Sequence, residues 1–202
     1  MEKERIDSQT EQVYEESKTA GSGMRMGKLL YRKKKDIEVH ITPEKRFVVK
    51  VGHSDEKHRL ELVVTFSHPH LSVEDIQCKM ERYPHKECIT AVSSLRAMVG
   101  KRVGPGLMNE LRELVGNRGC THLNNLFQEA CYSLVQGQAV FGESELRRLF
   151  PGISEEQIFK IFIRFKPDLI DSCVRYADGN DYMKRLENTP LPPGAELLKP
   201  VS

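Results

Sequence analysis

The chain has 202 residues, with 31 lysines and arginines against 29 aspartates and glutamates, so its formal net charge is +2. This length allows one ordinary domain with a small appendage and excludes a large two-domain enzyme. The balanced charge disfavours a dedicated nucleic-acid-binding protein, so no nucleic-acid partner is expected. No apolar run reaches the roughly 18–20 residues that span a bilayer, and the amino terminus lacks the apolar core of a signal peptide. We therefore expect a cytoplasmic protein that makes no contact with a membrane.

Composition divides the chain into four segments. Residues 1–27 are polar and are predicted to form a flexible tail, because they hold almost no apolar side chain to offset the entropy of ordering. The basic run at residues 31–35 is interpreted as a solvated edge. Residues 28–140 are predicted to form an α+β core domain, residues 141–187 a helical extension, and residues 188–202 an extended Pro-rich tail.

Three segments of the core domain alternate apolar and polar residues with the period of two that half-buried strands show. They lie at residues 47–51, 60–64 and 73–80. The turn sequences between them, residues 52–55 and 67–70, are short, which favours an antiparallel meander. The sequence therefore predicts a three-stranded antiparallel sheet.

Beyond the strands, apolar residues recur at the spacing of helices. Helices are predicted over residues 88–100, 107–116 and 120–137, and they are expected to cover the apolar face of the sheet. In the extension, Ser154 and Gln157 have the spacing of a capping box before an amphipathic helix. The fold class predicted from these patterns is α+β.

The five cysteines are an odd number without the spacing of a disulfide framework, so they are expected to be free thiols or ligands. Cys88 and Cys120 are predicted at the starts of helices, where the helix dipole stabilises the thiolate that attacks substrates or binds metals. Cys78, Cys131 and Cys173 fall on apolar faces and are predicted to be small buried hydrophobic residues.

Histidines lie near both helix-starting cysteines, His85 before Cys88 and His122 after Cys120. Neither spacing is that of a zinc knuckle, because no Cys-x-x-Cys pair is present. Two interpretations stay open. The thiols and imidazoles bind a ligand together, or both cysteines are core residues of the covering helices and both histidines are polar surface.

Histidines also gather in the two predicted turns. His53, Asp55 and His58 lie around the first turn with Ser54, but catalytic triads are defined by geometry across a fold and rarely form within one turn. The sequence His68-Pro69-His70 is interpreted as a solvated turn.

The sequence Gly104-Pro105-Gly106, followed about a dozen residues later by Gly-Cys-Thr-His-Leu at residues 119–123, resembles a bacterial family of domains of unknown function. The resemblance covers approximately residues 28–137. It implies no established activity.

A more distant similarity is to the iron–sulfur scaffold proteins of the NifU amino-terminal (IscU-like) type. In those proteins a cysteine opens a helix rich in Ala and Ser that ends in Gly-Lys, and a second cysteine opens a later helix after a basic residue. Cys88 and Cys120 match these two positions. The third scaffold cysteine lies in a Cys-Gly-Asp turn, and here that place reads His53-Ser54-Asp55, with His58 the nearer residue if the turn aligns differently. The resemblance implies a NifU/IscU-like fold with a mixed ligand set.

The first functional hypothesis is a non-enzymatic protein that handles a metal, an iron–sulfur cluster or transferred sulfur. Its ligands would be Cys88 and Cys120, with His53 or His122 and with Asp55, around zinc or an iron–sulfur cluster. Its partner would be a protein client or a cysteine-sulfur donor. The alternatives are an accessory protein-interaction factor with structural cysteines, and a thiol enzyme in which one of these cysteines is the nucleophile and a neighbouring histidine the base.

Overall fold

The computed structural model describes residues 27–198, so the tail predicted for residues 1–27 lies almost entirely outside the described residues. The chain divides into two compact units, Met1–Arg32 and Lys33–Ser202, and the second contains every helix and strand described below.

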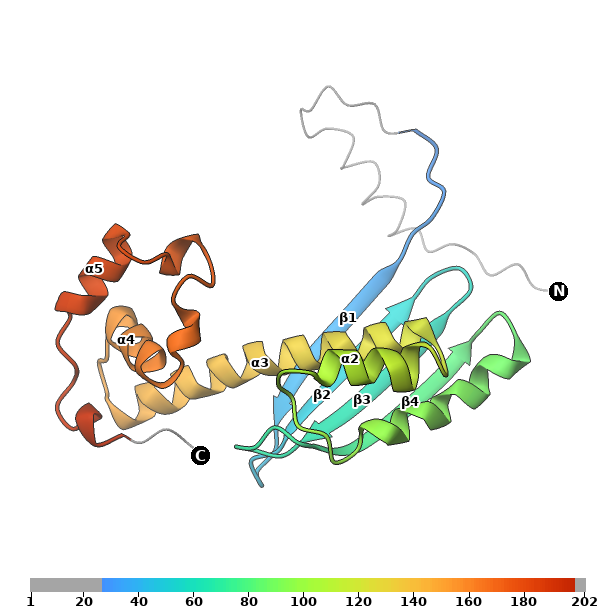
Figure 1. The fold of residues 1–202 in the computed structure, drawn as a ribbon, viewed down its shortest axis with the longest axis horizontal. Helices are drawn as coiled ribbons and strands as arrows, with labels where there is room; N and C mark the ends of the chain where they lie inside the picture. Colours follow the sequence, from blue (N-terminus) through green and yellow to red (C-terminus); the bar gives the residue numbers. More distant parts are fainter. Residues whose placement is uncertain (1–26, 199–202) are drawn as a thin grey trace. The chain divides into compact units, whose positions relative to one another are not determined.

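The second unit begins with an antiparallel sheet of four strands in the order β1-β2-β3-β4 (Figure 1). The α+β class is confirmed, but the prediction of three strands was wrong, because a further strand precedes them. The sequence does not indicate this strand clearly, because it lies at the sheet edge. There Ile37 and Ile41 remain 36% and 39% exposed, and the flanking residues are charged. The strand bounds are β1 (Lys34–Ile41), β2 (Phe47–Ser54), β3 (Arg59–Phe66) and β4 (Val73–Arg82).

One face of the two central strands, β2 and β3, is buried. In β2 the buried residues alternate strictly, from Phe47 through Val49 and Val51, and β3 repeats the pattern with Leu60 and its successors. Each of these side chains contributes about 1.5–3 kcal/mol by leaving water. The period of two read from the sequence therefore identified the apolar face correctly.

Helical segments cover this face, as predicted. The first is a 3-10 helix, η1 (Lys86–Met98), and the second is α2 (Leu107–Leu111), which continues directly as η2 (Arg112–Gly116), one turn of π-helix. The third is α3 (Thr121–Leu149), which lies across β1, β2 and β3.

Helix α3 runs to Leu149, so the predicted end near Gly137 was wrong, and the boundary placed at residue 140 falls inside a continuous helix. Gly137 does not stop the helix. It allows the helix to approach β1, since a Cβ atom at this position would lie 2.4 Å from Cγ1 of Val39. The absence of a side chain at Gly137 therefore allows α3 to pack closely against β1.

After α3 the chain forms α4 (Glu155–Phe165) and α5 (Asp181–Asn188). Three short 3-10 turns accompany them: η3 (Pro167–Leu169), η4 (Val174–Tyr176) and, in the segment predicted as a tail, η5 (Ala195–Leu197). The capping box predicted for α4 is present, because the Ser154 hydroxyl accepts from the amide of Gln157 and the Gln157 side chain accepts from the amide of Ser154.

A second small core joins the end of α3 to α4. Ile158 and Ile161 of α4 pack there with Leu146 of α3. Ala195 is fully buried in the same cluster, and Leu191 and Leu198 pack against it, so part of the segment predicted as a Pro-rich tail contacts this core. None of the helices within residues 27–198 has the length and apolar character needed to cross a membrane.

Candidate metal centre

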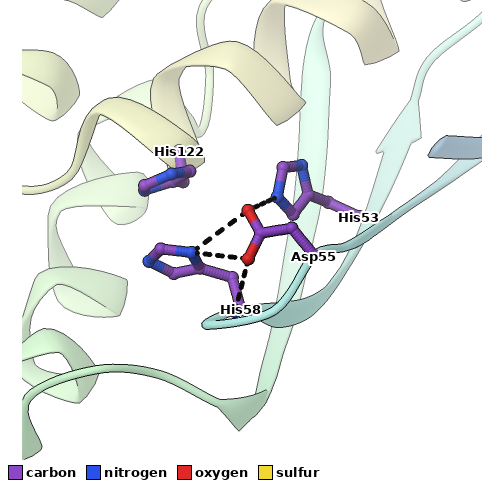
Figure 2. A group of neighbouring side chains, drawn as sticks. All are labelled: His53, Asp55, His58 and His122. Carbon is purple, nitrogen blue, oxygen red and sulfur yellow. Dashed lines mark hydrogen bonds and ion pairs between the residues drawn. The ribbon is translucent and has the colours of Figure 1, made fainter. Parts of the chain in front are cut away.

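Four side chains meet at one end of the sheet: His53, Asp55, His58 and His122. Each offers one potential ligand atom, and these atoms all lie within 4.8 Å of one another. Figure 2 shows the three imidazoles gathered around the carboxylate, with His122 approaching from the helix side.

The hairpin between β2 and β3 supplies three of the four. His53 continues the inward-facing series of β2, two residues beyond Val51, and is only 6% exposed. His58 stands two residues before Leu60, on the inward parity of β3. Side chains two residues apart in a strand lie on the same face of the sheet. Both histidines therefore lie on the buried face, where their rings approach each other.

Asp55 lies in the turn between them and is 8% exposed. Its Oδ1 accepts hydrogen bonds from the backbone amides of Lys57 and His58, at 2.8 and 2.7 Å. Nε2 of His53 lies 3.0 Å from Oδ2, and Nδ1 of His58 lies 3.1 Å from Oδ1. A carboxylate only accepts, so each of these imidazoles donates its N–H to Asp55. The turn thus fixes the carboxylate between two rings.

His122, the second residue of α3, completes the group. Its ring centroid lies 3.9 Å from that of His58 and 5.6 Å from that of His53. Burial lowers the pKa of His122 below its ordinary value of 6.5, and the neighbouring His58 and His53 lower it further, against an opposing effect of Asp55. The neutral imidazole, which is the form that binds metals, is therefore favoured here.

Cys120 lies next to this group without being a member of it. It is the N-cap residue of α3, as predicted, and its Sγ lies 3.8 Å from Nδ1 of His122. Cys88 is the third residue of η1 and lines a pocket together with Cys120, Arg118 and His85. The structure therefore places both cysteines along one pocket, and a thiolate pair as ligands remains a prediction.

Of the five residues predicted as ligands, His53, Asp55 and His122 come together, while Cys88 and Cys120 are not part of the four-residue group. His58 was predicted only as a substitute for His53, whereas in the structure both histidines belong to the four-residue group. The signal that identifies His58 is its parity with the buried residues of β3.

The remaining three cysteines differ in their exposure to solvent. Cys78 and Cys131 pack against or within the main core, as predicted, and burial raises the pKa of their thiols to about 11 and about 12. Cys173 is exposed, so its prediction as a buried residue was wrong.

The donor set of the group is three nitrogens and one carboxylate oxygen. With bonds of about 2.0–2.1 Å, two ligand atoms on a tetrahedral zinc lie roughly 3.3 Å apart. Oδ2 of Asp55 lies 3.0 Å from Nε2 of His53 and 3.3 Å from Nδ1 of His58, and both distances are close to this value. With neutral imidazoles the group carries one negative charge, which partly compensates a divalent cation.

Comparison with known proteins gives a family and no activity. A search of curated proteins and of solved structures finds no match to the chain. One family model, described as "Protein of unknown function (DUF2889)", matches residues 32–136, which include all four residues of the group. The chain belongs to this family.

Proposed function

We propose that this domain binds a divalent transition-metal ion through His53, Asp55, His58 and His122, and that zinc is the ion it fits best. The observation that carries the proposal is the convergence of four potential ligand atoms within 4.8 Å of one another at the buried end of the sheet. Imidazole and carboxylate donors suit zinc, whereas copper(I) and iron–sulfur clusters prefer thiolates.

The number of ligands indicates the kind of site. Four protein ligands close a tetrahedral shell, which is typical of structural and binding sites, while catalytic zinc keeps one position for water. His53 and Asp55 are also 6% and 8% exposed, which limits access for a substrate. We therefore propose a metal-handling protein rather than a hydrolytic enzyme, in the cytoplasm and without a nucleic-acid partner.

Sulfur handling is the second candidate, favoured by the contact between Cys120 and His122. A thiolate 3.8 Å from an imidazole of the group could replace one of the four ligands or orient His122 from outside. In this version Cys88, which lines the same pocket, would supply a further sulfur, and a protein client or cysteine-sulfur donor would approach there.

The test is zinc and cobalt titration of the full-length protein after treatment with a chelator, followed by calorimetry and visible absorption. One equivalent of zinc is expected to bind, with an affinity that falls as the pH is lowered, because a protonated imidazole must lose its proton to the buffer before its nitrogen can bind the metal. His53→Ala and His122→Ala should each weaken binding by at least the roughly 10- to 100-fold that loss of an outer-shell partner costs.

His70→Ala is the matched control, because His70 is exposed in the loop between β3 and β4. It should leave zinc affinity unchanged. Cobalt spectra separate the two candidates: an intense sulfur-to-metal charge-transfer band that disappears in Cys120→Ala would favour thiolate ligation. Absence of binding, or equal affinity in His122→Ala and His70→Ala, would refute the proposed site.

A further inference from the structure

A half-buried histidine, His68, belongs to a cluster of three aromatic rings elsewhere in the molecule. The ring of His68 lies 5.6 Å from that of Phe47 and 5.6 Å from that of Phe141, and the two phenylalanine rings are 5.8 Å apart. The interplanar angles lie between 84° and 87°, so all three rings meet edge to face. Edge-to-face ring pairs stabilise a fold beyond the contribution of the apolar area that they bury.

The cluster joins three parts of the fold. Phe47 begins β2, His68 lies in the loop between β3 and β4, and Phe141 lies on α3 beyond Gly137. Five residues further along α3, Leu146 belongs to the second core. The rings therefore attach α3 to the sheet just before the helix enters the second core.

His68 is the polar member of the cluster, and its environment disfavours a charge. Its Nδ1 is buried and has no hydrogen-bond partner among the described residues. Burial lowers the pKa of His68 below 6.5, and the positive charge of Lys45 lowers it further. On α3, the hydrogen bond from Arg148 lowers the pKa of Glu145, and the nearby Lys45 lowers it further, so this carboxylate stays ionised. Residues 68–70 form a turn, as predicted, and His70 is exposed, but His68 is only partly exposed and its Nδ1 is buried.

We propose that the cluster of Phe47, His68 and Phe141 is an acid-sensitive attachment of α3 to the sheet, which protonation of His68 weakens. A proton on this ring places a second cation near Lys45 and an unpaired charge between two phenylalanine rings. The unfolded chain offers the same histidine full hydration, so acid favours states in which His68 is released to water.

The direction of the pH dependence follows from linkage. The contribution of the neutral ring is complete above the unfolded-state pKa of about 6.5. It is lost as the pH falls from there through the folded-state value, because the unfolded state then binds more protons. Each unit between the two pKa values corresponds to a tenfold change in the unfolding equilibrium constant.

The experiment compares denaturant unfolding at pH 7.5 and pH 5.0 for the wild type, His68→Phe and His70→Phe, with a chelator present. The chelator removes any contribution of the proposed metal site, and the other histidines titrate in all three proteins. The unfolding equilibrium constant of the wild type and of His70→Phe should rise on acidification by a larger factor than that of His68→Phe. An equal rise in all three proteins would overturn the proposal.

A second measurement does not depend on a variant that folds. Titration of the wild type by NMR should place the pKa of His68 below its ordinary value of 6.5. Amide hydrogen exchange, corrected for its intrinsic pH dependence, should increase around Phe141 at pH 5.0 more than around Leu126 in the first half of α3. A pKa of His68 at or above 6.5 would refute the mechanism.

Discussion

The imidazoles of His58 and His122 lie with their ring centroids 3.9 Å apart, although one precedes a strand and the other opens a helix. This contact ties the hairpin between β2 and β3 to the first turn of α3. A metal bound by both rings would strengthen the same connection. Metal binding and the stability of the fold are therefore expected to be linked.

Zinc should raise the thermal stability of the protein. At a free zinc concentration one hundred times the dissociation constant, the expected stabilisation is about 2.7 kcal/mol. Differential scanning calorimetry with and without zinc measures it. In the double variant His58→Ala with His122→Ala the zinc-dependent increase in Tm should disappear, and an increase equal to that of the wild type would contradict the four-residue site.

Gly137→Ala should destabilise the protein by about 1–3 kcal/mol, the usual cost of overpacking. The new methyl group would lie 2.4 Å from Cγ1 of Val39, so the helix or the edge strand must shift. Urea unfolding measures the loss. In Gly142→Ala the methyl group would lie 3.4 Å from Phe162, an ordinary contact, so this variant of the same helix should be neutral or more stable.

Combining Gly137→Ala with Val39→Ala provides the complementary test. If the clash with Val39 is the cause, the double variant should lose less stability than the sum of the two single variants. Additive losses would show that Gly137 is needed for another reason.

Thiol labelling should separate the buried cysteines from the exposed one. Burial raises the pKa of Cys78 to about 11 and that of Cys131 to about 12, so both remain thiols at pH 8. The thiolate is the reactive form, and Cys173 is exposed. Iodoacetamide followed by peptide mass spectrometry should therefore modify Cys173 first. Modification of Cys131 at a similar rate in the folded protein would contradict the buried position.

Ser154→Ala should weaken α4 by about 0.5–2 kcal/mol, because the variant loses the hydroxyl that accepts from the amide of Gln157. Hydrogen exchange of the first turn of α4 reports this loss directly. Ser144→Ala is the control, since the Ser144 hydroxyl bonds a carbonyl inside α3 and caps no helix end. Its effect should stay within about 0.5 kcal/mol.

The sequence predicts a strand or helix correctly where the spacing of its apolar residues matches the spacing of its buried residues. The alternation from Phe47 to Val51 identified both the strand and its buried face. Strand β1 also alternates, but Ile37 and Ile41 lie at the exposed edge, and the lysines before them resemble a solvated segment. Gly137 was read as the end of a helix because its true partner, Val39, is distant in the sequence.

The candidate site was predicted in part for a similar reason. The similarity to iron–sulfur scaffold proteins pointed to His53 and Asp55, and the predicted start of a helix pointed to His122. What the sequence does not show is the packing of that helix start against the hairpin, which brings His58 and His122 into contact. The alternation of β2 extended by two residues beyond Val51 places His53 on the buried face of the sheet. The alternation of β3 extended by two residues before Leu60 places His58 on the same face.

The continuity of α3 restricts how this chain can change its length. One inserted residue in the middle of the helix would rotate everything beyond it by about 100°. His122 would keep its place, while Phe141 and Leu146 would turn away from their clusters. Relatives that share this arrangement should therefore differ in length after Leu149 and conserve the residue count between His122 and Leu146.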